Sequence, residues 1–200
     1  MRACDDYSGH PVTVLAKQIA PLVALRSEEL RSGTWDEIDF ENAVWRVPQK
    51  RMKGDCPGDH LVPLSRQALH LLRKLHLITG RRKCIFETVN SPGVCLFENT
   101  INQGYRRMGF PKEVVTLHGV RTTFSTFANE ATVGIGDEER RRFDKDWIER
   151  QLSHIDDTVR GTYNAAEYIG PRRGMMKWLA DYYDELAERS IIDTVKLPAM

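Results

Sequence analysis

The sequence predicts a mainly helical protein with one small three-stranded antiparallel sheet, which is a mixed α+β class. The first observation is that apolar residues recur at helical spacing over most of the chain, for example at Val12, Leu15 and Ile19. The second is a change of pattern between residues 35 and 64, where short β-rich runs alternate with turn-forming residues. A helical chain that is interrupted by a single meander of strands accounts for both observations.

The first elements are predicted to be two helices. The apolar spacing predicts a helix from Pro11 to Leu25, in which Pro21 would introduce a kink or start a new first turn. Ser27 suits the N-cap of a short second helix, and Gly33 suits its end. Together they form a predicted helix-turn-helix pair.

Three short strands are predicted to follow. They are Trp35 to Ile38, Ala43 to Val47 and His60 to Leu64. Turn formers occupy both gaps, over residues 39–42 and again over residues 54–58. The three strands are therefore expected to form an antiparallel meander.

The rest of the chain is predicted to be helical apart from one excursion. Ser65 should cap a helix that ends at Gly80, with an apolar face made of Leu69, Leu72, Leu75 and Leu77. Later helices are expected at roughly 99–108, 119–130, 145–153 and 172–188. The charged run between Glu130 and Lys145 is expected to be a solvated excursion.

Composition indicates one globular domain, and its nearly neutral net charge argues against a protein that coats polyanions over its whole surface. The 200 residues are 41% hydrophobic and 28% charged, with a net charge of +1. Residues 1–110 carry a net charge of +4 and residues 111–200 a net charge of −3, so a nucleic-acid surface would have to be local. We expect residues 1–200 to form a single domain with a core over about 9–189 and a flexible tail over 190–200.

Neither a membrane protein nor a secreted protein is expected. The longest apolar run, Ile19 to Leu25, is interrupted by Pro21, and the first residues lack the apolar core of a secretory signal. Four cysteines at positions 4, 56, 84 and 95 match neither a dense disulfide framework nor a zinc motif. Reduced thiols in a cytoplasm are the favoured interpretation.

Four segments contain the residues that could perform chemistry. The first is Arg26 to Leu30 and the second is Lys50 to Gly54. The third contains His118 and Arg121, which lie one helical turn apart and therefore share one face. The fourth is Gln151 to His154, and Tyr163 follows His154 by nine residues.

In this order the segments resemble the catalytic domain of the tyrosine recombinases, also called the phage integrase family. The family pattern is Arg-x-x-Glu-Leu, a Lys on the hairpin between the second and third strands, His-x-x-Arg, and Leu-x-His followed by the nucleophilic Tyr. The sequences of these segments are most similar to integrases of prophages and genomic islands. The resemblance covers about residues 9 to 189. The resemblance implies that the fold is the integrase catalytic domain and that the activity is site-specific DNA recombination.

The resemblance and the chemistry assign a role to each candidate. Arg26 and Arg121 would donate paired hydrogen bonds to the non-bridging oxygens of a DNA phosphate. Tyr163 would attack the phosphorus, with His118 as its base and His154 as a hydrogen-bond donor to the phosphate. Lys53 would protonate the leaving 5′ oxygen, although the sequence leaves Lys50 open as an alternative.

The expected partners are double-stranded DNA attachment sites and, by the resemblance, three further protomers in a DNA-bound tetramer. We expect no small-molecule substrate, no cofactor and no metal, because the arginines would stabilise the transition-state charge that a metal ion would otherwise stabilise. Two other functions stay open. They are type IB topoisomerase-like DNA relaxation and a non-catalytic DNA-binding remnant of an integrase.

The family pattern also includes segments that this chain does not match. Family members usually carry an additional N-terminal helical domain that closes around DNA, whereas 25 residues precede Arg26 here. We therefore expect the N-terminal DNA-binding domains to be absent.

Overall fold

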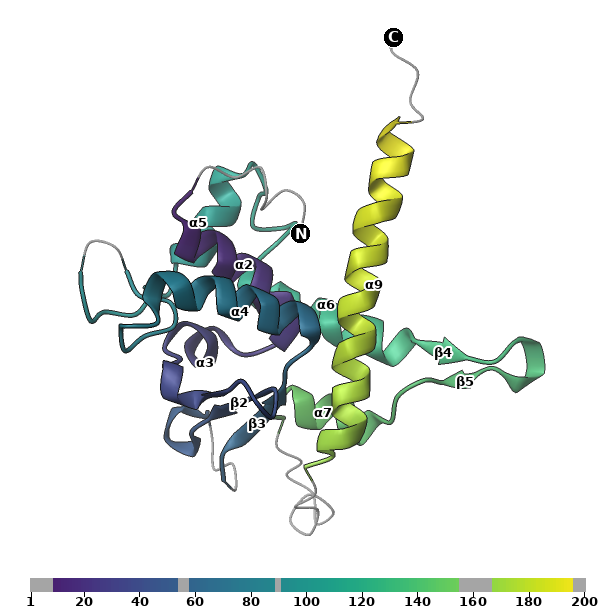
Figure 1. Ribbon diagram of the computed structural model, residues 1–200. Helices are drawn as coiled ribbons and strands as arrows, with labels where there is room; N and C mark the ends of the chain where they lie inside the picture. Colours follow the sequence, from purple (N-terminus) through teal and green to yellow (C-terminus); the bar gives the residue numbers. More distant parts are fainter. Residues whose placement is uncertain (1–8, 54–57, 89–90, 155–166, 196–200) are drawn as a thin grey trace.

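The computed structural model describes residues 9–53, 58–88, 91–154 and 167–195, and it confirms the predicted fold class (Figure 1). The helices are α2 (Pro11–Val23), α3 (Ser27–Arg31), α4 (Arg66–Thr79), α5 (Thr100–Arg107), α6 (Leu117–Glu130), α7 (Lys145–Gln151) and α9 (Ile169–Val195). The strands are β1 (Ile38–Asp39), β2 (Val44–Val47), β3 (His60–Pro63), β4 (Thr132–Val133) and β5 (Arg140–Arg141). No helix in these described ranges is both long and apolar enough to cross a bilayer.

The three-stranded sheet is an antiparallel meander in the order β1-β2-β3. Trp45 lies opposite Ile38 on one side and Val62 on the other, which places its fully buried indole in the core. The predicted first strand is too long, because Trp35–Glu37 forms a 3-10 turn. The indole nitrogen of Trp35 donates to the carbonyl of Thr79 at 2.9 Å, so a side-chain contact holds this turn against the end of α4.

The connection between α2 and α3 differs from the prediction at its cap. Pro21 lies inside α2, which continues to Val23 and ends at Ala24 in the left-handed region with φ of 52°. The N-cap of α3 is Arg26 and not Ser27, because the Glu29 carboxylate accepts the backbone N–H of Arg26 at 2.9 Å.

Helix α4 begins as predicted but presents a narrower apolar face. The Ser65 hydroxyl accepts the backbone N–H of Ala68 at 3.2 Å and caps the helix. Leu72 and Leu75 are fully buried, whereas Leu77 is 88% exposed. The prediction for Leu77 is wrong because a residue two positions beyond a buried one points away from the same helix face.

Two clusters of buried side chains hold the helices together. The larger one joins α2 and α4 to the sheet and includes Ile19, Leu22 and Trp45. The smaller one joins α6, α7 and α9 around Phe124 and Met175. Helix α9 runs to Val195, beyond the expected end at 188, so residues 190–195 of the expected tail are helical. Its far end projects away from both clusters (Figure 1).

Two local features were not predicted. The expected excursion after α6 is a projecting hairpin in which β4 pairs with β5, Thr132 opposite Arg141 (Figure 1). Cys84 and Cys95 form a disulfide, so the expectation of reduced thiols is wrong for this pair. Cys95 forms a β-bridge with Glu87, and the two cysteine Cα atoms lie 5.5 Å apart, within the range that a disulfide requires.

Candidate active site

A cleft of about 700 Å³ lies where the start of α3, the first turns of α6 and the turn after α7 meet. Five of the six predicted site residues line it: Arg26, Lys53, His118, Arg121 and His154. The sixth, Tyr163, lies outside the described residues. Residues that are separated by more than a hundred positions in the sequence therefore share one basic surface.

Arg26 is held in the cleft from two sides. Its Nη1 donates to the Glu29 carboxylate at 2.9 Å and also to the Ser153 hydroxyl, and its Nη2 donates to the Ser153 carbonyl at 3.1 Å. Glu29 is 1% exposed, and it accepts the Arg26 backbone N–H as well. Glu29 therefore holds both the guanidinium and the backbone N–H of Arg26.

Arg121 is the most deeply placed cation of the cleft. Its side chain is 6% exposed, and its two Nη atoms donate to the carbonyls of Ala24 at 2.6 Å and Leu152 at 2.7 Å. Burial, with a smaller contribution from the charge of Arg26 and against the opposing charge of Glu29, lowers the pKa of Arg121 to about 10. The guanidinium stays protonated at neutral pH and is oriented by two fixed carbonyl groups.

His118 and Lys53 are exposed members of the cleft wall. His118 lies in the first turn of α6. The N-cap of this helix is Thr116, and its hydroxyl accepts the Gly119 N–H at 2.9 Å. Lys53 follows the 3-10 turn η2 (Gln49–Arg51) in the connection between β2 and β3. Lys53 lines the cleft and Lys50 is not among the lining residues, so the geometry favours Lys53 over the alternative.

His154 lies just beyond the end of α7. Its Nδ1 is 2.6 Å from the Glu149 carboxylate, and its side chain is 48% exposed. This contact uses one ring nitrogen and leaves Nε2 for a partner in the cleft. The preceding Ser153 has φ of 48°, a strained conformation for a residue other than glycine, and the bonds from Arg26 hold it there.

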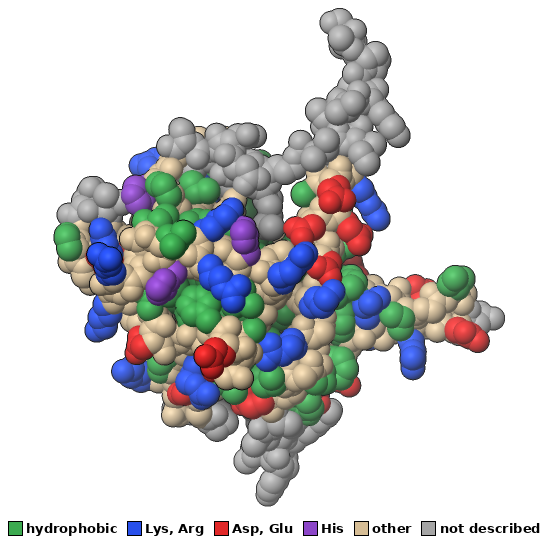
Figure 2. Space-filling model, viewed as in Figure 1, with side chains coloured by type: hydrophobic (Ala, Val, Ile, Leu, Met, Phe, Trp, Pro, Cys, Tyr) green, Lys and Arg blue, Asp and Glu red, His purple; other side chains and the backbone are tan. Residues whose placement is uncertain are grey.

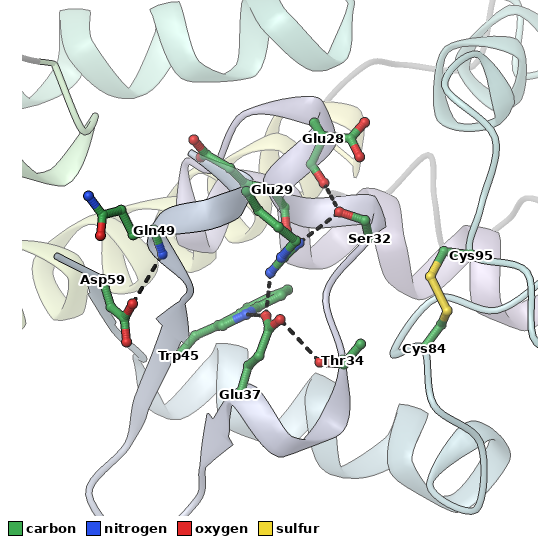
Figure 3. Close-up of polar contacts among 11 residues, drawn as sticks. Glu28, Glu29, Ser32, Thr34, Glu37, Trp45, Gln49, Asp59, Cys84 and Cys95 are labelled. Carbon is green, nitrogen blue, oxygen red and sulfur yellow. Dashed lines mark hydrogen bonds and ion pairs between the residues drawn. A yellow bond between two sulfur atoms is a disulfide. The ribbon is translucent and has the colours of Figure 1, made fainter. Parts of the chain in front are cut away.

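Arg51 is a supporting residue that the sequence analysis missed. Its Nη1 donates to the carbonyl of Glu29 at 3.0 Å and the hydroxyl of Ser32 at 2.7 Å, and its Nη2 pairs with Glu37. Glu37 also accepts the Trp45 indole N–H at 3.0 Å and the Thr34 hydroxyl at 3.1 Å (Figure 3). Arg51 thereby ties the segment that carries Lys53 to the helix that carries Arg26.

Gln151, Ser153 and Arg172 also support the site and were missed as such. Gln151 and Arg172 are fully buried. Polar side chains such as these are usually exposed, so the sequence alone predicts the opposite. No local signal could have found their roles, because the groups that they contact lie far away in the chain.

Two oriented guanidiniums, two imidazoles and an ammonium group on one surface can bind a phosphodiester and stabilise the charge of its transition state. Glu28 and Glu98 also line the cleft, which limits its positive charge at the rim. The arrangement is suited to phosphoryl transfer.

The chain belongs to the phage integrase family, because the model of that family matches residues 1–138. Among curated relatives, the integrase of Enterobacteria phage P4 is 37% identical over 191 residues, which is 89% of this chain and 42% of that protein. The chain thus spans less than half the length of the curated relatives it matches.

Solved structures agree on the fold. An integrase from mycobacterium phage Brujita superposes with a TM-score of 0.62 at 17% identity, covering 89% of this chain and 55% of that one. The Tn1549 transposon integrase, solved in complex with circular intermediate DNA, superposes with a TM-score of 0.55 at 17% identity and covers 88% of this chain and 61% of that one.

Proposed function

We propose that this chain cleaves and rejoins DNA strands in site-specific recombination, the reaction that integrates or excises a mobile element. Membership of the phage integrase family supports this proposal. The observation that carries it is the meeting of Arg26, Lys53, His118, Arg121 and His154 on one cleft. Double-stranded DNA is the proposed substrate, and the transposon integrase of similar fold has been solved on DNA.

In the proposed reaction the Tyr163 hydroxyl attacks a phosphorus of the DNA backbone and loses its proton to His118. The bond to the 5′ oxygen breaks, Lys53 protonates that oxygen, and a 3′-phosphotyrosyl link remains. Arg26, Arg121 and His154 bind the non-bridging oxygens while their charge increases. The 5′ hydroxyl of a partner duplex then reverses these steps, and because one phosphodiester replaces another, no external energy source is needed.

The assembly and location of the reaction are also proposals. We propose that four protomers assemble on two duplexes, with residues 171–189 of one protomer docking on its neighbour. Helix α9 projects from the body and is available for such a contact (Figure 1). We place the reaction at the nucleoid in a bacterial cytoplasm, where the proposed substrate lies.

The test uses nicked duplexes whose central sequence is randomised, incubated with the chain in EDTA. A nick lets the short strand beyond the cleaved bond diffuse away, so a covalent protein–DNA adduct accumulates even when cleavage is slow. We expect an adduct whose captured DNA, once sequenced, identifies a preferred core.

Tyr163→Phe removes one hydroxyl and should abolish the adduct without changing the far-ultraviolet circular dichroism spectrum. Tyr168→Phe serves as the matched control and should retain the adduct. An adduct that survives in Tyr163→Phe would refute the assignment of the nucleophile, and strict dependence on added magnesium would refute the metal-free mechanism.

A further inference from the structure

Arg172, in the first turn of α9, is a fully buried arginine that the proposed reaction does not use. Its Nε and Nη2 donate to the side-chain oxygen of Gln151 at 3.2 and 2.9 Å. Nη2 also donates to the Leu61 carbonyl at 2.6 Å, and Nη1 donates to the Glu167 carbonyl at 3.0 Å. A buried guanidinium is costly unless its donors are matched, and here all three nitrogens have acceptors.

These contacts connect three separate elements. Gln151 ends α7, and its amide nitrogen donates to the Val23 carbonyl at 3.0 Å at the end of α2. Leu61 belongs to β3, and Glu167 lies two residues before α9. Arg172 therefore fixes the start of α9 relative to both α7 and the sheet.

Three consecutive residues of α7 hold the residues on either side of the segment 155–166, which contains Tyr163. Glu149 contacts His154 at the near end at 2.6 Å. Arg150 forms an ion pair with Glu167 at the far end. Gln151 binds Arg172, which in turn holds the Glu167 carbonyl. The described residues on both sides of the segment, His154 and Glu167, are therefore fastened to the same short helix.

We propose that Arg172 is a positioning residue that fastens the far end of the segment carrying Tyr163 to α7, so that the nucleophile is presented to the phosphate in the cleft. The inference rests on the proposed function, because it assumes that Tyr163 attacks. Correct presentation matters strongly, since a displacement of about 1 Å in a reacting group can cost roughly a hundredfold in rate.

Other groups orient the two arginines that bind the phosphate. Arg26 is held by Glu29 and Ser153, and Arg121 by the carbonyls of Ala24 and Leu152. None of these bonds involves Arg172. A defect at Arg172 should therefore impair attack by the tyrosine while it leaves the binding and activation of the phosphate intact.

Arg172→Lys is the test variant, because a lysine keeps the charge but cannot reproduce the planar fork that bonds Gln151, Leu61 and Glu167 together. Arg173→Lys is the matched control on the same turn. Arg173 donates at the protein surface to the carbonyls of Asn42 at 3.0 Å and Ala43 at 3.4 Å. Arg150→Gln breaks the ion pair with Glu167 at a side chain that is 21% exposed, and it covers the case in which Arg172→Lys fails to fold.

Two cleavage reactions distinguish a role of Arg172 in positioning Tyr163 from a role in supporting the whole site. The first is adduct formation by Tyr163 on a nicked duplex selected as described above. The second uses the Tyr163→Phe background with added hydrogen peroxide, whose anion attacks the phosphorus in place of the phenol while the 5′ oxygen leaves with a proton. The second reaction does not use the tyrosine, so it reports on phosphate binding and on protonation of the 5′ oxygen.

We expect Arg172→Lys to slow adduct formation by at least about tenfold and to change peroxide-dependent cleavage by less than about threefold. Arg150→Gln should shift adduct formation in the same direction by a smaller factor, and Arg173→Lys should change neither reaction. Equal losses in both reactions, or an unchanged adduct rate in Arg172→Lys and Arg150→Gln, would overturn the inference. Peroxide-dependent cleavage without any tyrosine adduct in the parent chain would instead refute the proposed function, and this inference with it.

Discussion

Each guanidinium of the cleft is oriented by oxygens of the protein itself. Arg121 bonds two backbone carbonyls, and Arg26 bonds a carboxylate and both oxygens of Ser153. A guanidinium has five N–H donors, so each arginine keeps donors for a phosphate after these bonds are made. Such preorganisation means that binding a phosphate requires little movement of the cations.

The ammonium group of Lys53 is predicted to be the proton donor to the leaving 5′ oxygen. Lys53→Ala should lower the rate of adduct formation by about 10² to 10⁴, the usual contribution of a general acid. A substrate with sulfur in place of the 5′ oxygen should restore most of the rate, because a thiolate leaves without a proton. The measurement is single-turnover cleavage of both substrates, with Lys50→Ala as the control. A larger loss for Lys50→Ala than for Lys53→Ala would reverse the assignment.

The pH dependence of stability should reveal His60, which is 3% exposed. Burial, and then the nearby charges of Arg172, Arg150 and Arg121, hold the pKa of His60 well below its ordinary value of about 6.5, against a raising effect of its backbone hydrogen bond with Gln151. The unfolded chain therefore binds a proton near pH 6.5 that the folded chain does not. Stability is present in full above that pH and is lost as the pH falls below it.

Between pH 7.5 and 5.5 this proton should cost about 1 kcal/mol of the free energy of unfolding. Urea unfolding of the parent chain and of His60→Asn at the two pH values isolates the effect, since other groups titrate alike in both. An equal loss of stability in the two proteins would show that His60 does not carry it.

At the scale of single elements, two glycines that look alike in the sequence have opposite roles. A Cβ on Gly33 would lie 2.4 Å from Cζ2 of Trp45 and 3.2 Å from Cδ1 of Ile85, so this position requires space after α3. A Cβ on Gly174, inside α9, would meet nothing within 4 Å. Gly33 suits the end of α3 by its sequence position, whereas the C-cap is Ser32 and the glycine is needed for close packing.

Gly33→Ala should therefore lower the free energy of unfolding by about 1–3 kcal/mol through overpacking. Gly174→Ala should raise it by roughly 0.5–1 kcal/mol, because alanine loses less conformational entropy in a helix. Urea titration of both variants tests the pair. Similar effects of the two substitutions would contradict the packing described for Gly33.

At the scale of the whole molecule, charge is unevenly distributed. Acidic side chains gather where α9 leaves the body, and lysine and arginine side chains are spread over the rest of the visible face (Figure 2). With a net charge of +1, the chain offers few phosphate contacts outside the cleft. Its affinity for DNA should depend only weakly on salt.

We predict a slope of log affinity against log salt of about −2 to −4 for the chain on a duplex, since each phosphate contact contributes about −0.9. Fluorescence anisotropy between 50 and 200 mM salt measures it. Fusion behind a helical DNA-binding domain should add phosphate contacts and steepen the slope, and we expect recombination from the fused protein only. Efficient exchange by residues 1–200 alone would show that they are self-sufficient.

The sequence by itself determined most of the elements and the candidate residues. Helical spacing predicted α2, α4 and α6, turn residues predicted the meander, and the order of the motifs indicated Arg26, Lys53, His118, Arg121 and His154 before any contact was known. These signals are local, because periodicity and motif spacing are properties of neighbouring residues. The role of Tyr163 is still a prediction from such spacing.

The tertiary structure alone decided what holds those residues. The partners of Arg121 are the carbonyls of Ala24 and Leu152, and the partners of Arg172 include Gln151 and Leu61. Every residue except the chain end has a carbonyl group, so sequence cannot indicate which one a guanidinium will meet. The exposure of Leu77 and the pairing of Cys84 with Cys95 were decided in the same way, since burial and distance depend on how distant segments pack and not on the residues beside them.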